Sequence, residues 1–180
     1  MSMTQVQCLN PLRNKKDGLS KVKLHKERNE ARVSRAKYSL IKLESYCDSR
    51  GGLISFEKNK NCPFDVKRCF YLFDTKGKNT KRGKHANIRS KFLLIVISGS
   101  CRVKIDTGKE KHDFLLNNPY EALYLDKMVW KEMYEFSHNM VLMVLSNEVY
   151  DENEYIRSYK AFKRMVSKSS SSFNGTIYDT

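Results

Sequence analysis

The chain has 180 residues and a mass of 21.1 kDa, with 34 Lys and Arg residues against 20 Asp and Glu residues. This length fits one domain rather than two, because a chain of about 150 residues buries roughly two-thirds of its extended surface on folding. The 40% hydrophobic and 11% aromatic content excludes a wholly disordered or fibrous chain, and no apolar run reaches the roughly 18 residues of a membrane helix. Residues 1–40 lack the apolar stretch of a signal peptide, so the sequence predicts a soluble protein of the cytoplasm.

The formal net charge of +14 is concentrated near the start of the chain. Residues 1–40 hold 10 Lys and Arg residues against 3 Asp and Glu residues, which is half of the excess positive charge. Large apolar side chains are few there, so we expect a basic, loosely ordered extension, with at most a solvated helix from about Lys21 to Tyr38. At the other end, the serine run that begins at Ser167 predicts a flexible tail over 167–180.

Between these ends, over residues 41–166, short strand-like segments recur about every 8 to 12 residues. They are rich in aromatic and β-branched side chains. The segments are Cys69–Phe73, Phe92–Ile97, Cys101–Ile105, Phe114–Leu116, Ala122–Leu125, Met128–Phe136 and Met140–Leu145. Gly99-Ser100 predicts a tight turn, and no helical pattern separates the strands. The pattern favours a mainly β fold, an antiparallel sandwich or barrel, over an α/β fold.

One helix is expected after the strands. The residues that share an apolar face at 3.6-residue spacing are Tyr155, Ile156, Tyr159, Phe162 and Val166. Asp151 or Asn153 can cap the start of this helix.

The basic segment 76–85 is the strongest chemical signal. Five Lys or Arg side chains and two glycines lead into His85. Arg offers a planar fork to phosphate oxygens and Lys a point charge, so the segment can hold a diphosphate beside a titratable imidazole. The alternative is a solvated loop beside a structural histidine. The five cysteines contain no C-x-x-C pair, so no zinc site is indicated.

Seven short motifs, taken in order, resemble those of a known family. They are Asp48–Leu53, Pro63-Phe64, Tyr71–Thr75, Arg82–Ala86, Gly99-Ser100, Val129–Met133 and Tyr155–Arg157. Over residues 41–166 the chain resembles the sugar 3,4-ketoisomerases of the cupin superfamily, the WxcM-like group that acts on dTDP-4-keto-6-deoxyglucose. The resemblance implies a cupin-type small antiparallel β-barrel, or jelly roll, with a C-terminal α-helix. It also implies a role in deoxysugar biosynthesis for a surface glycan.

The resemblance implies a set of catalytic residues as well. Ketoisomerisation removes the proton on carbon 3, passes through an enediol or enediolate, and returns a proton to carbon 4, which suits an imidazole base. The usual family motif is His-x-His, whereas this chain has His85 followed by Asn87. We expect His85 to carry the carbon proton and Asn87 to donate a hydrogen bond to the carbonyl or enolate oxygen. Tyr71 matches a family tyrosine and is the expected proton shuttle between the oxygens.

Basic side chains are the candidate ligands of the substrate. The resemblance implies four of them: Arg68, Arg82, Arg102 and Lys131. Arg82, with Arg68, is expected to anchor the diphosphate.

The resemblance also bears on metal binding. Metal-binding cupins use a His-x-His pair, a nearby Glu and a later His as ligands. This chain has His85, Asn87, Lys91 and Lys131 in the matching regions. Ammonium groups repel a divalent cation, so we expect no metal, and the resemblance implies no other cofactor.

The family's members form homodimers that exchange N-terminal strands, and Ser49–Lys58 has strand character without an evident hairpin partner, so we expect a homodimer. Two other functions stay open. One is a cupin of this family that binds a nucleotide sugar without isomerising it. The other is a basic module that binds nucleic acid or an acidic surface through residues 1–40. Neither a membrane nor nucleic acid is the preferred partner.

Overall fold

The computed structural model describes residues 36–57, 60–76 and 79–171. Residues 1–35 of the extension expected over 1–40, and residues 172–180 of the tail expected over 167–180, lie outside the described residues. The predicted boundary between residues 40 and 41 falls inside strand β1 (Tyr38–Lys42), which pairs with β9 (Glu121–Leu125). The folded part of the chain therefore includes Tyr38.

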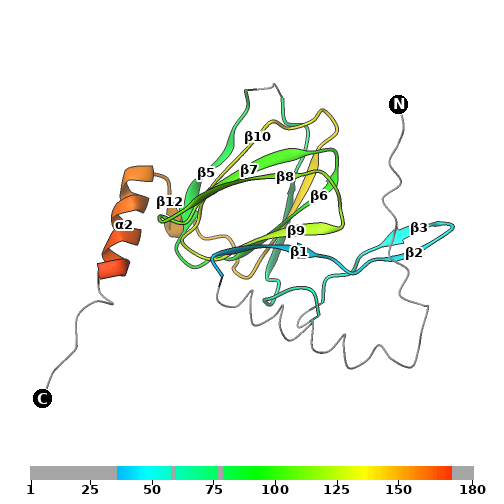
Figure 1. The fold of residues 1–180 in the computed structure, drawn as a ribbon, viewed down its shortest axis with the longest axis horizontal. Coiled ribbons are helices and arrows are strands. Elements are labelled where there is room, and N and C mark those ends of the chain that lie inside the picture. Colours follow the sequence, from blue (N-terminus) through cyan, green and yellow to red (C-terminus); the bar gives the residue numbers. More distant parts are fainter. Residues whose placement is uncertain (1–35, 58–59, 77–78, 172–180) are drawn as a thin grey trace, which may run out of the picture.

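Two five-stranded antiparallel sheets face each other (Figure 1). The first has the order β1, β9, β6 (Phe92–Ser98), β11 (Val141–Ser146) and β4 (Arg68–Leu72). The second has the order β12 (Tyr155–Ile156), β5 (Arg82–Asn87), β10 (Trp130–Tyr134), β7 (Cys101–Asp106) and β8 (Lys111–Leu116). This arrangement confirms the predicted mainly β fold; in the described residues the two sheets pack as a jelly-roll sandwich whose ladders do not close into one barrel.

The side-chain alternation of the strands builds the core. Phe92, Leu94 and Val96 of β6 pack against Val103 and Ile105 of β7. These contacts hold the two sheets together. Arg102 and Lys104, which alternate with Val103 and Ile105 along β7, are more exposed, because the outer face of that part of the strand meets solvent.

Strand β6 is apolar along nearly its whole length because both of its faces are covered. Leu93 and Ile95 point away from the main core. They form a second buried cluster with Leu43 and Cys62, which precede β6 in the chain. A strand covered on both faces reads as a continuous hydrophobic run, as Phe92–Ile97 does.

A small hairpin extends away from the sandwich, on the side opposite α2 (Tyr159–Ser171) (Figure 1). It joins β2 (Tyr46–Asp48) to β3 (Gly51–Leu53), and its Tyr46 and Leu53 side chains are exposed. Part of the segment Ser49–Lys58 thus does have a local strand partner, contrary to the expectation from sequence.

The predicted helix begins later than expected. Asp151 caps the short 3-10 helix η1 (Glu152–Glu154), as its side chain accepts a hydrogen bond from the backbone of Asn153. Tyr155 and Ile156 then form β12 and pair with β5 instead of opening a helix. The start of the predicted helix is wrong because this ladder and a buried Glu154 fix the chain before α2.

Helix α2 covers one end of the second sheet. Phe162 is fully buried and packs with Trp130 and Ile156. Among the residues that the structure describes, no helix has the length and apolar composition to cross a membrane.

Candidate active site

A cavity of about 230 Å³ opens between the two sheets near β4, β5 and β10. Its walls are mostly apolar, with a few polar side chains, which is the usual make-up of a small-molecule site. The lining residues are Phe70, Leu72, Arg82, Gly83, His85, Phe92, Leu94, Lys131, Met133, Val144 and Tyr155. Three of the predicted site residues, Arg82, His85 and Lys131, are therefore brought together.

An irregularity in β5 brings Arg82 and His85 to the same cavity. Gly83 has φ +82° and Lys84 has φ +54°, and the pairing of β5 with β10 shifts register at Lys131. A Cβ atom on Gly83 would stand 2.7 Å from the carbonyl oxygen of Lys131, so only glycine fits there. Regular alternation alone would have sent Arg82 and His85 to opposite faces.

His85 is positioned as a neutral base. Its Nδ1 lies 2.9 Å from the carbonyl oxygen of Gly83. A carbonyl can only accept, so Nδ1 carries the hydrogen and Nε2 keeps a free lone pair. Burial, followed by the charge of Lys131, lowers the pKa of His85 to about 4. The imidazole is therefore neutral at pH 7.

Lys131 is a buried lysine at the cavity wall. It is directly opposite His85 across the β5–β10 pair, and its side chain is almost fully buried. Its Nζ donates to Oδ1 of Asn87 at 2.6 Å and lies 4.5 Å from the ring centroid of Phe92. Burial lowers the pKa of Lys131 to about 7, against an opposing contribution from Glu154.

Asn87 lies behind Lys131 and does not line the cavity. It is 1% exposed, accepts the hydrogen bond from Lys131 and donates from Nδ2 to Oε1 of Glu154 at 3.3 Å. Both ends of its amide are thus engaged within the protein.

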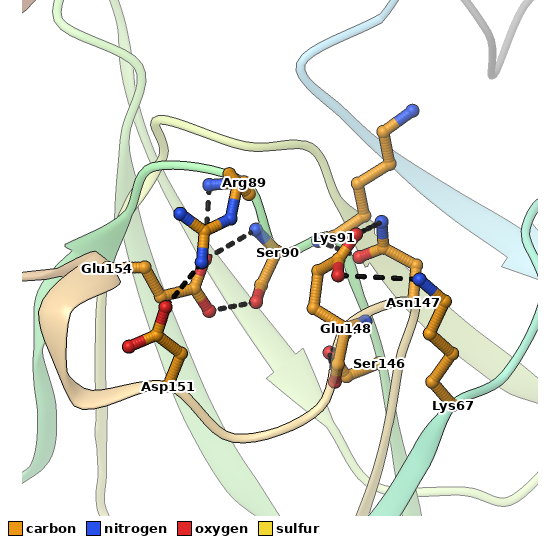
Figure 2. Close-up of polar contacts among 9 residues, drawn as sticks. All are labelled: Lys67, Arg89, Ser90, Lys91, Ser146, Asn147, Glu148, Asp151 and Glu154. Atoms are coloured by element: carbon orange, nitrogen blue, oxygen red, sulfur yellow. Dashed lines mark hydrogen bonds and ion pairs between the residues drawn. The ribbon is translucent and has the colours of Figure 1, made fainter.

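Glu154 is a fully buried carboxylate that sequence reasoning missed. Figure 2 shows it beside Arg89 and Ser90: Oε2 accepts from the backbone N–H groups of both residues, at 3.1 and 3.0 Å, and Oε1 accepts from the Ser90 hydroxyl. These bonds compensate for its burial. The only signal in the sequence is that Glu154 directly precedes the motif that begins at Tyr155.

Tyr71 does not reach the cavity. Phe70 and Leu72 line it, so alternation along β4 turns Tyr71 to the opposite face. There Tyr71 is 62% exposed and its ring centroid lies 5.5 Å from that of Phe73. The aromatic residue of β4 inside the cavity is Phe70, which has no titratable hydroxyl.

The two remaining arginines differ. Arg68 lies beside the cavity, with its guanidinium 5.0 Å from the ring centroid of Phe70, and its buried Nε and Nη2 atoms find no acceptor among the described residues. Arg102 lies on the outer face of β7 and pairs with Asp113 at 3.4 Å and Glu135 at 3.1 Å, away from the cavity. Arg68 thus retains free donors, whereas Arg102 is engaged at the surface.

Acidic and imidazole side chains do not gather as metal ligands would. Within the described ranges, no three His, Cys, Asp or Glu residues lie close enough together to hold a metal ion.

Comparison with known proteins identifies the family to which the chain belongs. The family model described as FdtA: WxcM-like, C-terminal, matches residues 36–167. A TDP-4-oxo-6-deoxy-alpha-D-glucose-3,4-oxoisomerase from Aneurinibacillus thermoaerophilus is 43% identical over 129 residues, which is 72% of this chain and 92% of the relative.

Solved structures give the same result. A 3,4-ketoisomerase from Helicobacter canadensis is 38% identical, with a TM-score of 0.71 over 74% of this chain and 99% of that chain. The sugar 3,4-ketoisomerase QdtA from Thermoanaerobacterium thermosaccharolyticum, solved in complex with TDP, is 33% identical, with a TM-score of 0.71 over 75% and 98% of the two chains. The fold and the family are thus those of sugar 3,4-ketoisomerases. The chain belongs to the WxcM-like FdtA family, as its motifs predict.

Proposed function

We propose that the protein converts a TDP-linked 4-keto-6-deoxyglucose to its 3-keto isomer. It is an isomerase of the WxcM-like family, and the relatives described above are named for this reaction or bind TDP. The observation that carries the proposal is His85, a neutral imidazole with a free Nε2 in the cavity beside the buried Lys131.

His85 performs the carbon chemistry in this proposal. Its Nε2 takes the proton from carbon 3, and the electron pair of that bond forms the double bond between carbons 3 and 4. The imidazolium then returns the proton to carbon 4 as a carbonyl forms at carbon 3. One positioned base can serve both steps, since the two carbons are adjacent.

Arginine side chains hold the nucleotide in this proposal. Arg82 is exposed at the edge of the cavity, and Arg68 close by offers N–H groups at Nε and Nη2 that have no acceptor in the described part of the chain. Guanidinium groups suit diphosphate oxygens because they donate two parallel hydrogen bonds. The apolar wall formed by Phe70, Phe92 and Leu94 suits the 6-deoxy sugar, which carries a methyl group.

The test is product identity. The full chain is incubated with TDP-4-keto-6-deoxyglucose in heavy water, and the signals of carbons 2, 3 and 4 are followed by NMR. A TDP-3-keto-6-deoxyhexose should accumulate. If the protein binds TDP but forms no product, it is a nucleotide-sugar-binding member of the family instead.

We further propose a cytoplasmic homodimer. The exposed apolar side chains of Tyr46, Leu53, Tyr71 and Phe73 lie on the β2–β3 hairpin and on or directly after the edge strand β4, and exposed apolar surface of this kind favours association. Light scattering at micromolar concentration should give about twice 21.1 kDa. A single monomeric species would contradict this proposal.

A further inference from the structure

We propose that Lys131 is the second proton-transfer residue of the cavity, which protonates the oxygen on carbon 4 and then accepts the proton of the oxygen on carbon 3. The inference rests on the proposed function. Isomerisation must move a proton between these oxygens as well as between the carbons, and Tyr71 lies outside the cavity.

The cavity offers few candidates for this second role. Its titratable lining residues are Arg82, His85, Lys131 and Tyr155. Arginine does not give up its proton in proteins. His85 is used at the carbons, so Lys131 and Tyr155 remain, and Lys131 is the one directly opposite His85.

The electrostatics couple Lys131 to His85. The charged groups around the two are Glu154 on η1, Arg68 on β4 and Arg157, which directly follows β12. The positive charge of Lys131 helps to hold the pKa of His85 low. When Lys131 passes its proton to the substrate oxygen, that repulsion disappears and His85 becomes a stronger base as it takes the carbon proton.

Asn87 allows Lys131 to exist in both protonation states. The Asn87 amide oxygen can accept a hydrogen bond from the ammonium form and from the neutral amine form of Lys131. A carboxylate there would favour the ammonium strongly. Asn87 instead donates a hydrogen bond to Glu154, whose carboxylate already accepts hydrogen bonds from Arg89 and Ser90. Asn87 therefore acts as a positioning residue for Lys131.

The steps balance without another reactant. As Nε2 of His85 takes the proton on carbon 3, the carbonyl electron pair moves to oxygen 4, which takes a proton from the ammonium of Lys131. The neutral amine then takes the proton from oxygen 3 as that oxygen becomes a carbonyl, and His85 returns its proton to carbon 4. The total charge of His85 and Lys131 is the same at every stage.

The experiment compares Lys131→Arg and Lys131→Met with Lys104→Met, an exposed lysine on β7. Lys131→Arg keeps the charge that stabilises an enolate but cannot transfer its proton. It should lower product formation by about 10²-fold or more, yet retain exchange of the carbon-3 proton for deuterium within about tenfold of the unmodified protein. Lys131→Met should lose both, Lys104→Met neither, and TDP affinity should stay within about threefold throughout.

The pH profile separates proton transfer from packing. In the unmodified protein kcat should fall as the pH rises through about 7, where Lys131 loses its proton, and this decline should vanish in the residual activity of Lys131→Arg. Product formation by Lys131→Arg within threefold of the unmodified protein would overturn the proposal while leaving the isomerase function intact.

A measurement without substitution completes the test. NMR of the ¹³Cε-labelled lysines in the TDP-bound protein should show one lysine that titrates near pH 7 and is absent from Lys131→Arg. Titration of Lys131 above pH 9 would overturn the proposal. If the unmodified protein forms no product, the isomerase function fails, and the role of Lys131 falls with it.

Discussion

At the scale of single residues, the chemistry depends on the neutral state of His85. Its Nδ1 is directed to Gly83 and its Nε2 remains free. We predict that His85→Asn lowers turnover by about 10²–10⁴-fold, the usual contribution of a positioned general base. TDP affinity should change little, since His85 acts on the sugar. His138→Asn is the control, because that imidazole is exposed; equal turnover of the two variants would contradict the assignment.

The same residue makes stability depend on pH. The pKa of His85 falls from 6.5 in the unfolded chain to about 4 in the folded protein, so the unfolded state binds more protons between these values. The free energy of unfolding should therefore rise with pH from about 4 to 6.5. Urea denaturation at pH 4.5 and 6.5 should assign on the order of 2 kcal/mol of that rise to His85. The rise should be smaller by that amount in His85→Asn; an unchanged rise means that the folded imidazole is not depressed.

The sequence alone does not show which of two adjacent aromatic residues of β4 faces the cavity. Phe70 and Tyr71 are adjacent aromatic residues, and either could face the cavity in a strand. The motif favoured Tyr71, whereas the register of β4 against β11 turns Phe70 inward. Register depends on a distant part of the chain, so the sequence alone could not decide between the two.

At the scale of elements, the core strands were predictable and the polar ones were not. β6 and β11 carry long apolar stretches, and such stretches are typical of buried strands. β5 was interpreted as part of a basic loop because Arg82 and Lys84 dominate it. β12 was interpreted as helix because Tyr155 and Ile156 fit both periods, and its pairing partner, β5, lies far away in the sequence and cannot be seen locally.

Substitutions at Gly83 and Gly99 can distinguish what the active site needs from what the fold needs. Gly83→Ala forces a Cβ onto the backbone of Lys131 and should lower both turnover and stability. Gly99 also has positive φ, +70°, and its added Cβ would stand 2.9 Å from Cα of Met140; neither residue lines the cavity. Gly99→Ala should therefore cost stability, about 1–3 kcal/mol, with unchanged kcat in the folded fraction. If Gly83→Ala and Gly99→Ala changed kcat equally, the irregularity in β5 would have no special role in catalysis.

At the scale of the whole molecule, the sandwich and its cavity are formed by residues 36–171. The sequence predicted a boundary between residues 40 and 41, because charge and hydrophobicity change together there. It missed the start of β1, since Tyr38–Lys42 holds two charged or polar residues and gains its stability from pairing with β9.

The basic extension can be tested by removal. A chain that begins at residue 36 keeps β1 and should retain TDP affinity within about threefold, because no predicted ligand lies before Arg68. Isothermal titration calorimetry of both chains measures this. If TDP binding is unchanged, the nucleotide site lies in the sandwich; if removal abolishes it, residues 1–35 belong to the binding site.

The central claim is that one imidazole moves the proton between the two carbons. It is tested most directly with TDP-4-keto-6-deoxyglucose deuterated at carbon 3, converted in ordinary water under single-turnover conditions and analysed by NMR and mass spectrometry. A measurable part of the deuterium should appear on carbon 4 of the 3-keto product, and His85→Asn should form product about 10²–10⁴-fold more slowly. A product whose carbon 4 carries only solvent hydrogen, at the earliest times measured, would contradict transfer by a single base.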